Sequence, residues 1–201
     1  MSKPIKILIF FIIFALLLLF LFAVLPHQSS LLAPTPTPSA STKPNTELMS
    51  IDSPDGKFSL TLKKHKNQNT ITYSFFVKDV EKNEEILIFT KELVSPDSIS
   101  IPFNSFSPNN KYLFLKEQAN TQTNYYVMST NLTPFKNGEK YLSVSDFFTK
   151  KYDKLTLEDI TGWADPNLLV LNTNTLEGKP SYSLWFEISS NSFIQLATRF
   201  N

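Results

Sequence analysis

The side chains that most often carry catalysis are scarce in this 201-residue chain, which has two histidines and no cysteine. His65 lies in the basic run Lys63 to Lys66, without a neighbouring carboxylate or nucleophile, and His27 lies in a proline-rich stretch. A Ser-His-Asp triad or a Cys-His pair is therefore not indicated. A serine–lysine pair remains open, although no local pattern singles one out. Without cysteine the chain also cannot form disulfides, thiolate metal sites or the lipid anchor of a bacterial lipoprotein.

Carboxylates could support hydrolysis instead, and the adjacent acidic pairs are Glu84-Glu85 and Glu158-Asp159. Neighbouring residues on a strand point to opposite faces, so neither pair is expected to form one site. We interpret both as solvated turn acids. Carboxylates from separate elements could still converge, as they do in glycosidases. No loop is typical of a calcium site, and we predict no catalytic residue, no metal ligand and no cofactor.

Aromatic side chains could bind sugars or peptides, and Trp163, Trp185, Tyr125 and Tyr126 are the residues that suggest this. Most aromatics, however, lie in alternating segments, where they are expected to pack a core. We therefore predict that the two tryptophans pack between sheets. The Asn131-Leu132-Thr133 sequence matches a glycosylation acceptor, a pattern too frequent to carry weight.

The N-terminal quarter predicts a membrane anchor. Residues 7–25 contain no polar side chain, and a helix of that length spans about 28 Å, close to the roughly 30 Å of a hydrocarbon core. Lys3 and Lys6 precede this segment, and the next positive charge is Lys43. The positive-inside rule then predicts a cytoplasmic tip at residues 1–6 and an extracytoplasmic remainder. A cleaved signal peptide is the alternative, but residues 7–25 are longer than usual for one, and Leu21 stands where a small residue is expected.

Residues 26–46 predict a linker because they combine five prolines with serine, threonine and alanine, and carry one charge, Lys43. Such a sequence prefers an extended polyproline conformation. At full extension it could hold a domain up to about 60 Å from the membrane. We interpret it as a spacer; a ligand for a proline-reading domain is the less favoured reading.

Residues 47–201 predict one predominantly β domain. They alternate apolar and polar residues in short runs rich in β-branched and aromatic side chains, for example residues 99–106, which is typical of strands. One helix is predicted at residues 145–154, with Ser145 as its N-cap. Removing the three lysines before residue 47 from the 19 basic residues leaves 16, against 18 acidic residues, for a net charge of −2. This balance argues against nucleic-acid binding.

Three proline turns recur ahead of apolar segments, and they predict a repeat. They are Ser53-Pro54-Asp55-Gly56, Ser107-Pro108-Asn109-Asn110 and Asp165-Pro166-Asn167, which lead into Phe58, Tyr112 and Leu168. Pro54 and Pro108 are 54 residues apart, and Pro166 follows 58 residues later. A strand that ends in polar residues follows each one, at residues 73–79, 125–131 and 182–189.

These turns and strands resemble the blades of WD40-like, TolB-type β-propeller proteins; residues 106–113 and 125–129 match best. The resemblance spans about residues 50–198 and implies antiparallel blade-like sheets. Closed propellers usually have four to eight blades, whereas three units are visible here. The resemblance therefore implies a shortened, propeller-like array. A β-sandwich or a barrel with repeated turns is the alternative.

From these features we predict a single-pass, membrane-anchored module that contacts the lipid bilayer through residues 7–25. Its extracytoplasmic domain is expected to bind a protein or an envelope polymer, or to act as a scaffold, without catalysis. A carboxylate-dependent envelope hydrolase is the alternative. Three blades leave two apolar sheet faces open. We expect residues 47–51 to cover one of them by joining the last sheet; otherwise we expect a homodimer through those ends.

Overall fold

A computed structural model describes residues 46–199 except residues 121 and 137. The predicted tip, the anchor and the linker up to residue 45 lie outside the described residues. Thr46, the last residue assigned to the linker, already begins the first strand. Within the described part of the chain, no helix is long and apolar enough to cross a membrane.

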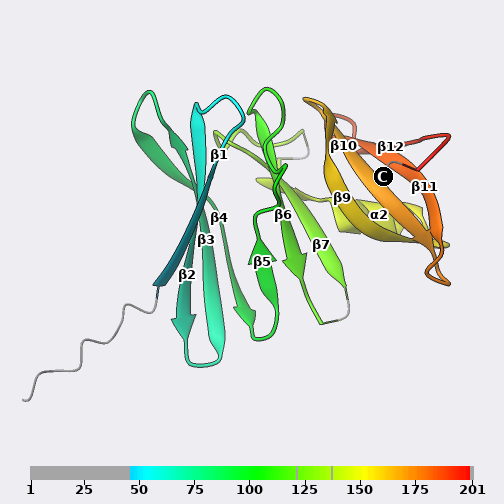
Figure 1. The fold of residues 1–201 in the computed structure, drawn as a ribbon, viewed down its shortest axis with the longest axis horizontal. Coiled ribbons are helices and arrows are strands. Elements are labelled where there is room, and N and C mark those ends of the chain that lie inside the picture. The colour runs from blue at the N-terminus through cyan, green and yellow to red at the C-terminus, as the bar shows by residue number, and fades with distance from the viewer. Residues whose placement is uncertain (1–45, 121, 137, 200–201) are drawn as a thin grey trace, which may run out of the picture. The chain divides into compact units, whose positions relative to one another are not determined.

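The domain is mainly β and consists of three four-stranded antiparallel sheets, in each of which consecutive strands are neighbours. Figure 1 shows the sheets following one another across the domain. The first sheet contains β1 (Thr46–Asp52), β2 (Phe58–Asn67), β3 (Thr70–Asp79) and β4 (Glu84–Val94). The middle sheet contains β5 (Ser98–Ser100), β6 (Tyr112–Gln118), β7 (Thr123–Ser129) and β8 (Tyr141–Ser143). The third sheet contains β9 (Leu155–Asp165), β10 (Leu168–Thr175), β11 (Pro180–Glu187) and β12 (Ser192–Gln195).

The three proline turns occupy equivalent places, as the repeat predicts. Phe58, Tyr112 and Leu168 begin β2, β6 and β10, and each of these is the second strand of its sheet. The polar-ended strands are the third strands, β3, β7 and β11. Three separate sheets differ from the two sheets of a sandwich and from the single closed sheet of a barrel.

The first proline turn is held by a ring of short-range hydrogen bonds. The Asp55 carboxylate accepts from the Ser53 hydroxyl at 2.8 Å and from the Lys57 amide at 3.1 Å. The Ser53 hydroxyl accepts from the Phe58 amide at 3.0 Å. Gly56 ends the turn at φ 71°, a conformation that glycine adopts at little cost.

The second proline turn contains the same three hydrogen bonds at equivalent positions. The Asn109 carboxamide oxygen accepts from the Ser107 hydroxyl at 3.0 Å and from the Lys111 amide at 3.1 Å. The Ser107 hydroxyl accepts from the Tyr112 amide at 3.0 Å. Asn110 stands in the place of Gly56 with φ 57°, which asparagine tolerates better than most residues. The two sequences therefore encode one local structure.

The two turns also contact each other, because the Asn110 side-chain amide donates to the Asp55 carboxylate at 2.7 Å. The hydrogen bonds from Lys57, Ser53 and Asn110, in that order, hold the pKa of Asp55 well below its ordinary value of 3.8. The third turn keeps a single bond of this kind, from the Asn167 amide to Asp165 at 3.1 Å. The sequence of the third turn is correspondingly the most divergent of the three.

We expect Asp55→Asn to make the domain less sensitive to acid. A carboxyl group with a lowered folded-state pKa adds stability above its unfolded pKa and loses it as the pH falls through the folded value. Asparagine keeps the acceptor oxygen, as Asn109 does in the second turn, but does not titrate. Urea unfolding between pH 5 and pH 2 should therefore give a flatter dependence of the unfolding free energy on pH for the variant. Parallel curves for the two proteins would contradict this role of Asp55.

Two apolar clusters fill the spaces between neighbouring sheets. In β6, Leu113 and Leu115 face the first sheet and Phe114 faces the third, and all three are fully buried. The middle sheet is therefore covered on both faces, whereas the first and third sheets each use one face for a cluster. This arrangement follows from the alternation of side chains along a strand.

The described helix, α2 (Val144–Lys151), is capped by Ser143, whose hydroxyl accepts from the Asp146 amide. The predicted N-cap, Ser145, is wrong, because the helix begins two residues earlier in the sequence. Ser145 is buried, and its hydroxyl accepts from the Tyr125 amide at 3.0 Å. The helix also ends at Lys151 instead of residue 154, because Tyr152 is already extended.

Two further expectations are wrong. Residues 47–51 do not join the last sheet; they lie in β1, which pairs antiparallel with β2 in the first sheet. The outward face of the first sheet, expected to be apolar, is instead mainly polar. Its hydroxyl groups come from eight residues: Thr46, Ser50, Ser59, Thr61, Thr70, Thr72, Ser74 and Thr90. Several of these are mutually bonded, for example Ser50 and Ser59 at 2.8 Å. We call this surface the hydroxyl face.

Candidate functional site

A groove of about 910 Å³ lies where parts of all three sheets approach one another, and its lining is mainly apolar. The first sheet contributes the end of β1 and the turn that follows. The middle sheet contributes the loop before β6, and the third sheet contributes β9 and β10. The lining residues are Ile51, Asp52, Pro54, Phe103, Asn104, Phe106, Pro108, Thr161, Gly162, Trp163 and Val170.

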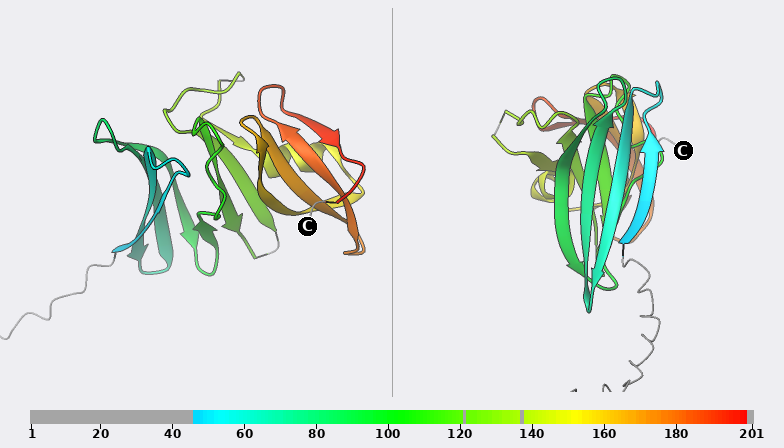
Figure 2. Two further views of the ribbon diagram at one scale, coloured as in Figure 1. Left: turned by 45° about the horizontal axis from the view of Figure 1, so that its top comes forward. Right: turned by 90° about the vertical axis from the view of Figure 1, so that its left-hand side faces the viewer.

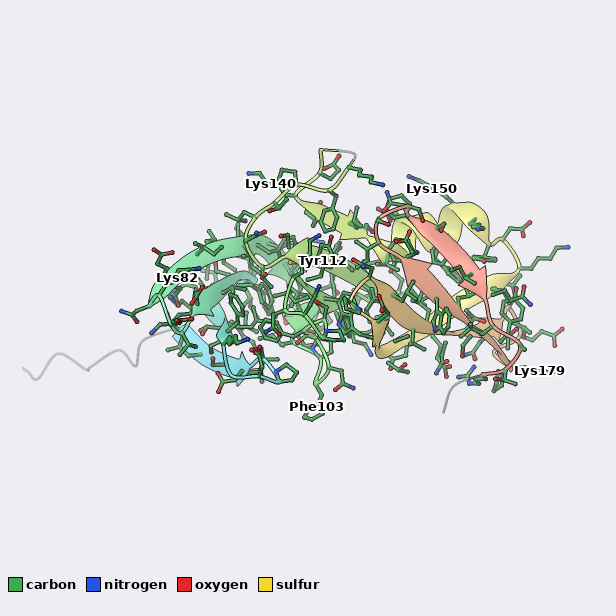
Figure 3. The ribbon with its side chains drawn as sticks, turned by 90° about the horizontal axis from the view of Figure 1, so that it is seen from above. Lys82, Phe103, Tyr112, Lys140, Lys150 and Lys179 are labelled. Carbon is green, nitrogen blue, oxygen red and sulfur yellow. The ribbon has the colours of Figure 1, made fainter. Side chains whose placement is uncertain are left out.

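Phe103 is the most unusual residue of this groove, because 96% of its surface is exposed. It lies in the loop between β5 and β6, and Figure 3 shows it projecting away from the sheets. The sequence predicts a strand through residues 99–106, but β5 ends at Ser100. A large exposed aromatic ring at the rim of an apolar groove is typical of a protein-binding surface.

Trp163 forms a fixed wall of the groove. Its indole Nε1 donates to the Ser105 carbonyl oxygen at 3.0 Å. Its ring lies 6.5 Å from the Tyr112 ring in a stacked arrangement and 6.2 Å from the Phe114 ring. These contacts hold the indole in place before any ligand binds. They also confirm the prediction that Trp163 packs between sheets.

The loop that carries Phe103 is tied to β9 at Asn104. The Asn104 side-chain amide donates to the Thr161 carbonyl oxygen at 3.3 Å. Gly162 lies at φ 145°, and a Cβ atom there would approach the Asn104 Cβ to 3.2 Å. Glycine at this position therefore allows the loop to lie close to β9, which sets the shape of the groove.

A smaller groove of about 370 Å³ adjoins the first, with which it shares Phe103, Asn104 and Thr161. Two charged residues, Lys116 and Asp159, line it and form an ion pair at 3.1 Å. The buried Tyr125 hydroxyl donates to the same Asp159 oxygen at 2.5 Å. Burial, and then Asp159, raise the pKa of Tyr125 far above its ordinary value. The phenol therefore stays protonated at neutral pH and acts as a hydrogen-bond donor between sheets.

A matching network joins the first and middle sheets. The Lys91 ammonium group donates to the Glu117 carboxylate at 2.6 Å and to the Tyr126 hydroxyl at 3.0 Å. The Tyr126 hydroxyl donates to the same carboxylate oxygen at 2.8 Å. Only 5% of the Glu117 side chain is exposed, and burial raises the pKa of Tyr126 to about 12. Each pair of neighbouring sheets is thus joined by a lysine, a carboxylate and a tyrosine.

The two acidic pairs lie in strands, and the expectation of turn acids is wrong for both. Glu84 and Glu85 belong to β4, and Glu85 pairs with Lys63 at 3.2 Å. Glu158 and Asp159 belong to β9, a strand that the sequence does not predict. They have separate partners, because Glu158 pairs with Arg199 and Asp159 pairs with Lys116. The two neighbouring carboxylates therefore interact with different parts of the domain.

The remaining candidates are dispersed over the domain. Tyr125 and Tyr126 are buried in different apolar clusters. The prediction that Trp185 packs between sheets is wrong, because its neighbours Leu184 and Phe186 on β11 face the core and Trp185 faces the other way, opposite Val170 and Ile194. His65 is exposed, and its ring Nδ1 lies 3.4 Å from the Thr46 hydroxyl oxygen. None of these residues lines the main groove. Of the predicted aromatic candidates, only Trp163 does.

A third groove, of about 760 Å³, lies beside α2 and the β6–β7 turn. Its lining is rich in uncharged polar side chains, among them Gln118, Gln122 and Asn124. Its aromatic residues, Phe148 and Tyr152, pack against each other and belong to the core between the middle and third sheets. This groove therefore presents hydrogen-bonding groups but lacks an exposed anchor comparable to Phe103.

Within residues 46–199, apart from the two undescribed positions, no group of three or more histidine, aspartate or glutamate residues could hold a metal ion. No protein-family model matches the chain. A search of curated proteins likewise finds none that is significantly similar.

Proposed function

We propose that this protein is a membrane-anchored, extracytoplasmic binding module whose groove receives an extended segment of another protein. The observation that carries the proposal is the Phe103 ring, 96% exposed beside the fixed Trp163 indole. Leaving a phenylalanine side chain in water forgoes about 1.5–3 kcal/mol of burial energy. A partner that covers the ring recovers that energy.

The composition of the groove favours a polypeptide occupant. Asp52 is its one charged lining residue, and the other side chains are aromatic, aliphatic, proline, glycine or uncharged polar. Binding hot spots are enriched in tryptophan and lie in well-packed pockets surrounded by less important contacts. Trp163 is the tryptophan of this groove, and Pro54 and Pro108 add conformationally restricted residues to its lining. A protein partner therefore suits this surface better than an anionic envelope polymer.

The finer description of the fold is part of this proposal. Each sheet is a meander of four strands in chain order, with the proline turn before the second strand. This order supports a shortened, propeller-like array of three blades. The first strands β1 and β9 and the loop after β5 contribute to the groove. The groove would then take the place of a propeller's central channel, open on one side.

A carboxylate-dependent hydrolase is the weaker reading. One small groove between the first and middle sheets contains two acids, Asp79 and Glu84, together with Lys82. Hydrogen bonds from Lys82 lower the pKa of Asp79, however, whereas a general acid needs a raised pKa. That arrangement favours an ion pair over acid–base chemistry.

The anchor is tested by adding protease to intact protoplasts. We expect removal of residues 47–201 and retention of a small membrane-bound fragment, because residues 7–25 have the length and polarity of a membrane span. A soluble mature protein that begins between residues 23 and 34 would instead identify a cleaved signal peptide.

The groove is tested by placing the photo-crosslinking residue p-benzoylphenylalanine at position 103 in living cells. Leu176 is a suitable control position, because it is 66% exposed and lies in the turn between β10 and β11. We expect a protein adduct at position 103 that is absent at position 176. With the captured protein purified, Phe103→Ala should weaken its affinity about tenfold or more. Equal capture at both positions would overturn the proposed site.

A further inference from the structure

We infer that the free edge of β1 pairs with β1 of a second copy of this chain. Among the strands of residues 46–199, β1 is an edge strand, because β2 is its one neighbour in the sheet. In the right-hand view of Figure 2, it forms one border of the first sheet. Residues 46–50 are all exposed, with Leu48 at 68% and Met49 at 50%. This edge therefore presents unpaired backbone groups together with apolar side chains.

The sequence of β1 contains no lysine, proline or bulge; of the features that protect an edge strand it has two acidic residues, Glu47 and Asp52. Natural edges are often protected by lysine, proline, a bulge or a very short strand. β1 has seven residues, Thr-Glu-Leu-Met-Ser-Ile-Asp, and pairs with β2 without a register shift. Unbroken pairing over seven residues leaves an edge about 23 Å long. By contrast, β5 at the corresponding edge of the middle sheet has three residues.

The charges on β1 select an antiparallel arrangement of two copies. In a parallel, in-register pair, Glu47 would face Glu47 and Asp52 would face Asp52, and like charges directly opposite are unfavourable. In an antiparallel pair centred on Met49, Glu47 faces Ile51 and Asp52 faces Thr46. Thr46 and Asp52 can then form a hydrogen bond. Because Met49 is the midpoint of β1, all seven residues are paired in this register.

The same register also extends the core between the first and middle sheets. Met49 lies opposite Leu62, and Ile51 lies opposite Leu60, on the face that is buried in that core. An antiparallel partner places its own Met49 beside this row and covers side chains that one copy leaves exposed. It also brings its Thr46 next to Asp52, which lines the main groove. The two copies would therefore share one edge of the candidate site.

The length of chain before β1 permits this contact between two anchored copies. Forty-five residues precede Thr46, and the proline-rich part alone can span about 60 Å. Confinement to one membrane raises the effective concentration of the two domains. This step relies on the proposed anchor, whereas the free edge and the charge pattern do not.

Cysteine crosslinking tests the pairing cleanly, because the natural chain contains no cysteine. We would introduce Leu48→Cys, Met49→Cys or Ser50→Cys singly into the full-length protein, oxidise isolated membranes and run non-reducing gels. Added oxidant makes the assay independent of the side of the membrane on which the domain lies. The matched control is Leu87→Cys, on β4 at the opposite edge of the same sheet and 46% exposed.

We expect Met49→Cys to form at least tenfold more covalent dimer than Leu87→Cys. Adding Leu48→Lys to Met49→Cys should abolish the dimer, because a lysine protects the edge while leaving an exposed position folded. Dimer yields at positions 48, 49 and 50 that do not exceed the yield at position 87 would overturn the inference. So would a mixed disulfide with a different protein in place of the dimer.

Discussion

Replacing Lys91 with alanine is expected to cost the domain about 2–3 kcal/mol, one of the two largest effects foreseen here. The substitution leaves the Glu117 carboxylate buried without its ion-pair partner, and removing one member of a buried pair typically costs about 3–5 kcal/mol. The lower figure applies because 35% of the Lys91 side chain is exposed, so that solvent already screens the pair. Urea unfolding of residues 44–201 measures the loss.

Two matched variants isolate the cause of this loss. The triple variant Lys91→Met, Glu117→Met and Tyr126→Phe removes both charges and the hydroxyl that bonds to them. It should recover most of the stability, since apolar groups often replace buried ion pairs without loss. Lys179→Ala removes an exposed lysine that pairs with Glu177 at 2.9 Å, and should change stability by less than about 0.5 kcal/mol. A loss for Lys91→Ala no larger than that for Lys179→Ala would show that the Lys91–Glu117 pair does not stabilise the contact between sheets.

Phe114→Ala is expected to destabilise the domain by about 3–5 kcal/mol. Its ring is fully buried between the middle and third sheets, near Tyr125 and Trp163. Removing it leaves a cavity that the surrounding strands cannot close. Thermal or urea unfolding, followed by circular dichroism, measures the change.

Phe103→Ala makes the same chemical change at a position that is 96% exposed. It should alter stability by no more than about 0.5 kcal/mol, while weakening binding of the protein captured at the groove. The predictions for Phe103→Ala and Phe114→Ala both depend on the difference in burial between the two rings. Comparable unfolding free energies for the two variants would contradict them.

The repeated turns were the most predictable part of this fold. Each turn is defined by four consecutive residues: serine, proline, aspartate or asparagine, and a residue that tolerates positive φ. The roles of Gly56 and Asn110 could therefore be predicted without any long-range information. Strand β9 was missed because Glu158, Asp159 and Gly162 interrupt its alternation. Three register shifts against β10 also leave Glu158, Thr161 and Ala164 without a partner in the ladder, and such shifts depend on the neighbouring strand.

The site was less predictable than the fold. Trp163 was singled out as an aromatic, but Phe103 was assigned to a strand because Ile99, Ile101 and Phe103 alternate with other residues. Its exposure depends on the Asn104 contact with β9, which joins residues 57 apart in the sequence. The helix cap was misplaced for a similar reason. Ser145 has the right chemistry, but the distant Tyr125 amide engages its hydroxyl.

The hydroxyl face has a consequence for how such a chain can lengthen in evolution or in design. In repeat arrays, end units need a polar outer surface to remain soluble. A duplicated unit placed before the first sheet would have to bury serine and threonine side chains without replacing the water they lose. A duplicated unit beside the middle sheet would meet apolar surfaces on both sides. Growth by gene duplication is therefore favoured in the interior of the array, and the composition of its outermost sheet limits extension from the N-terminal end.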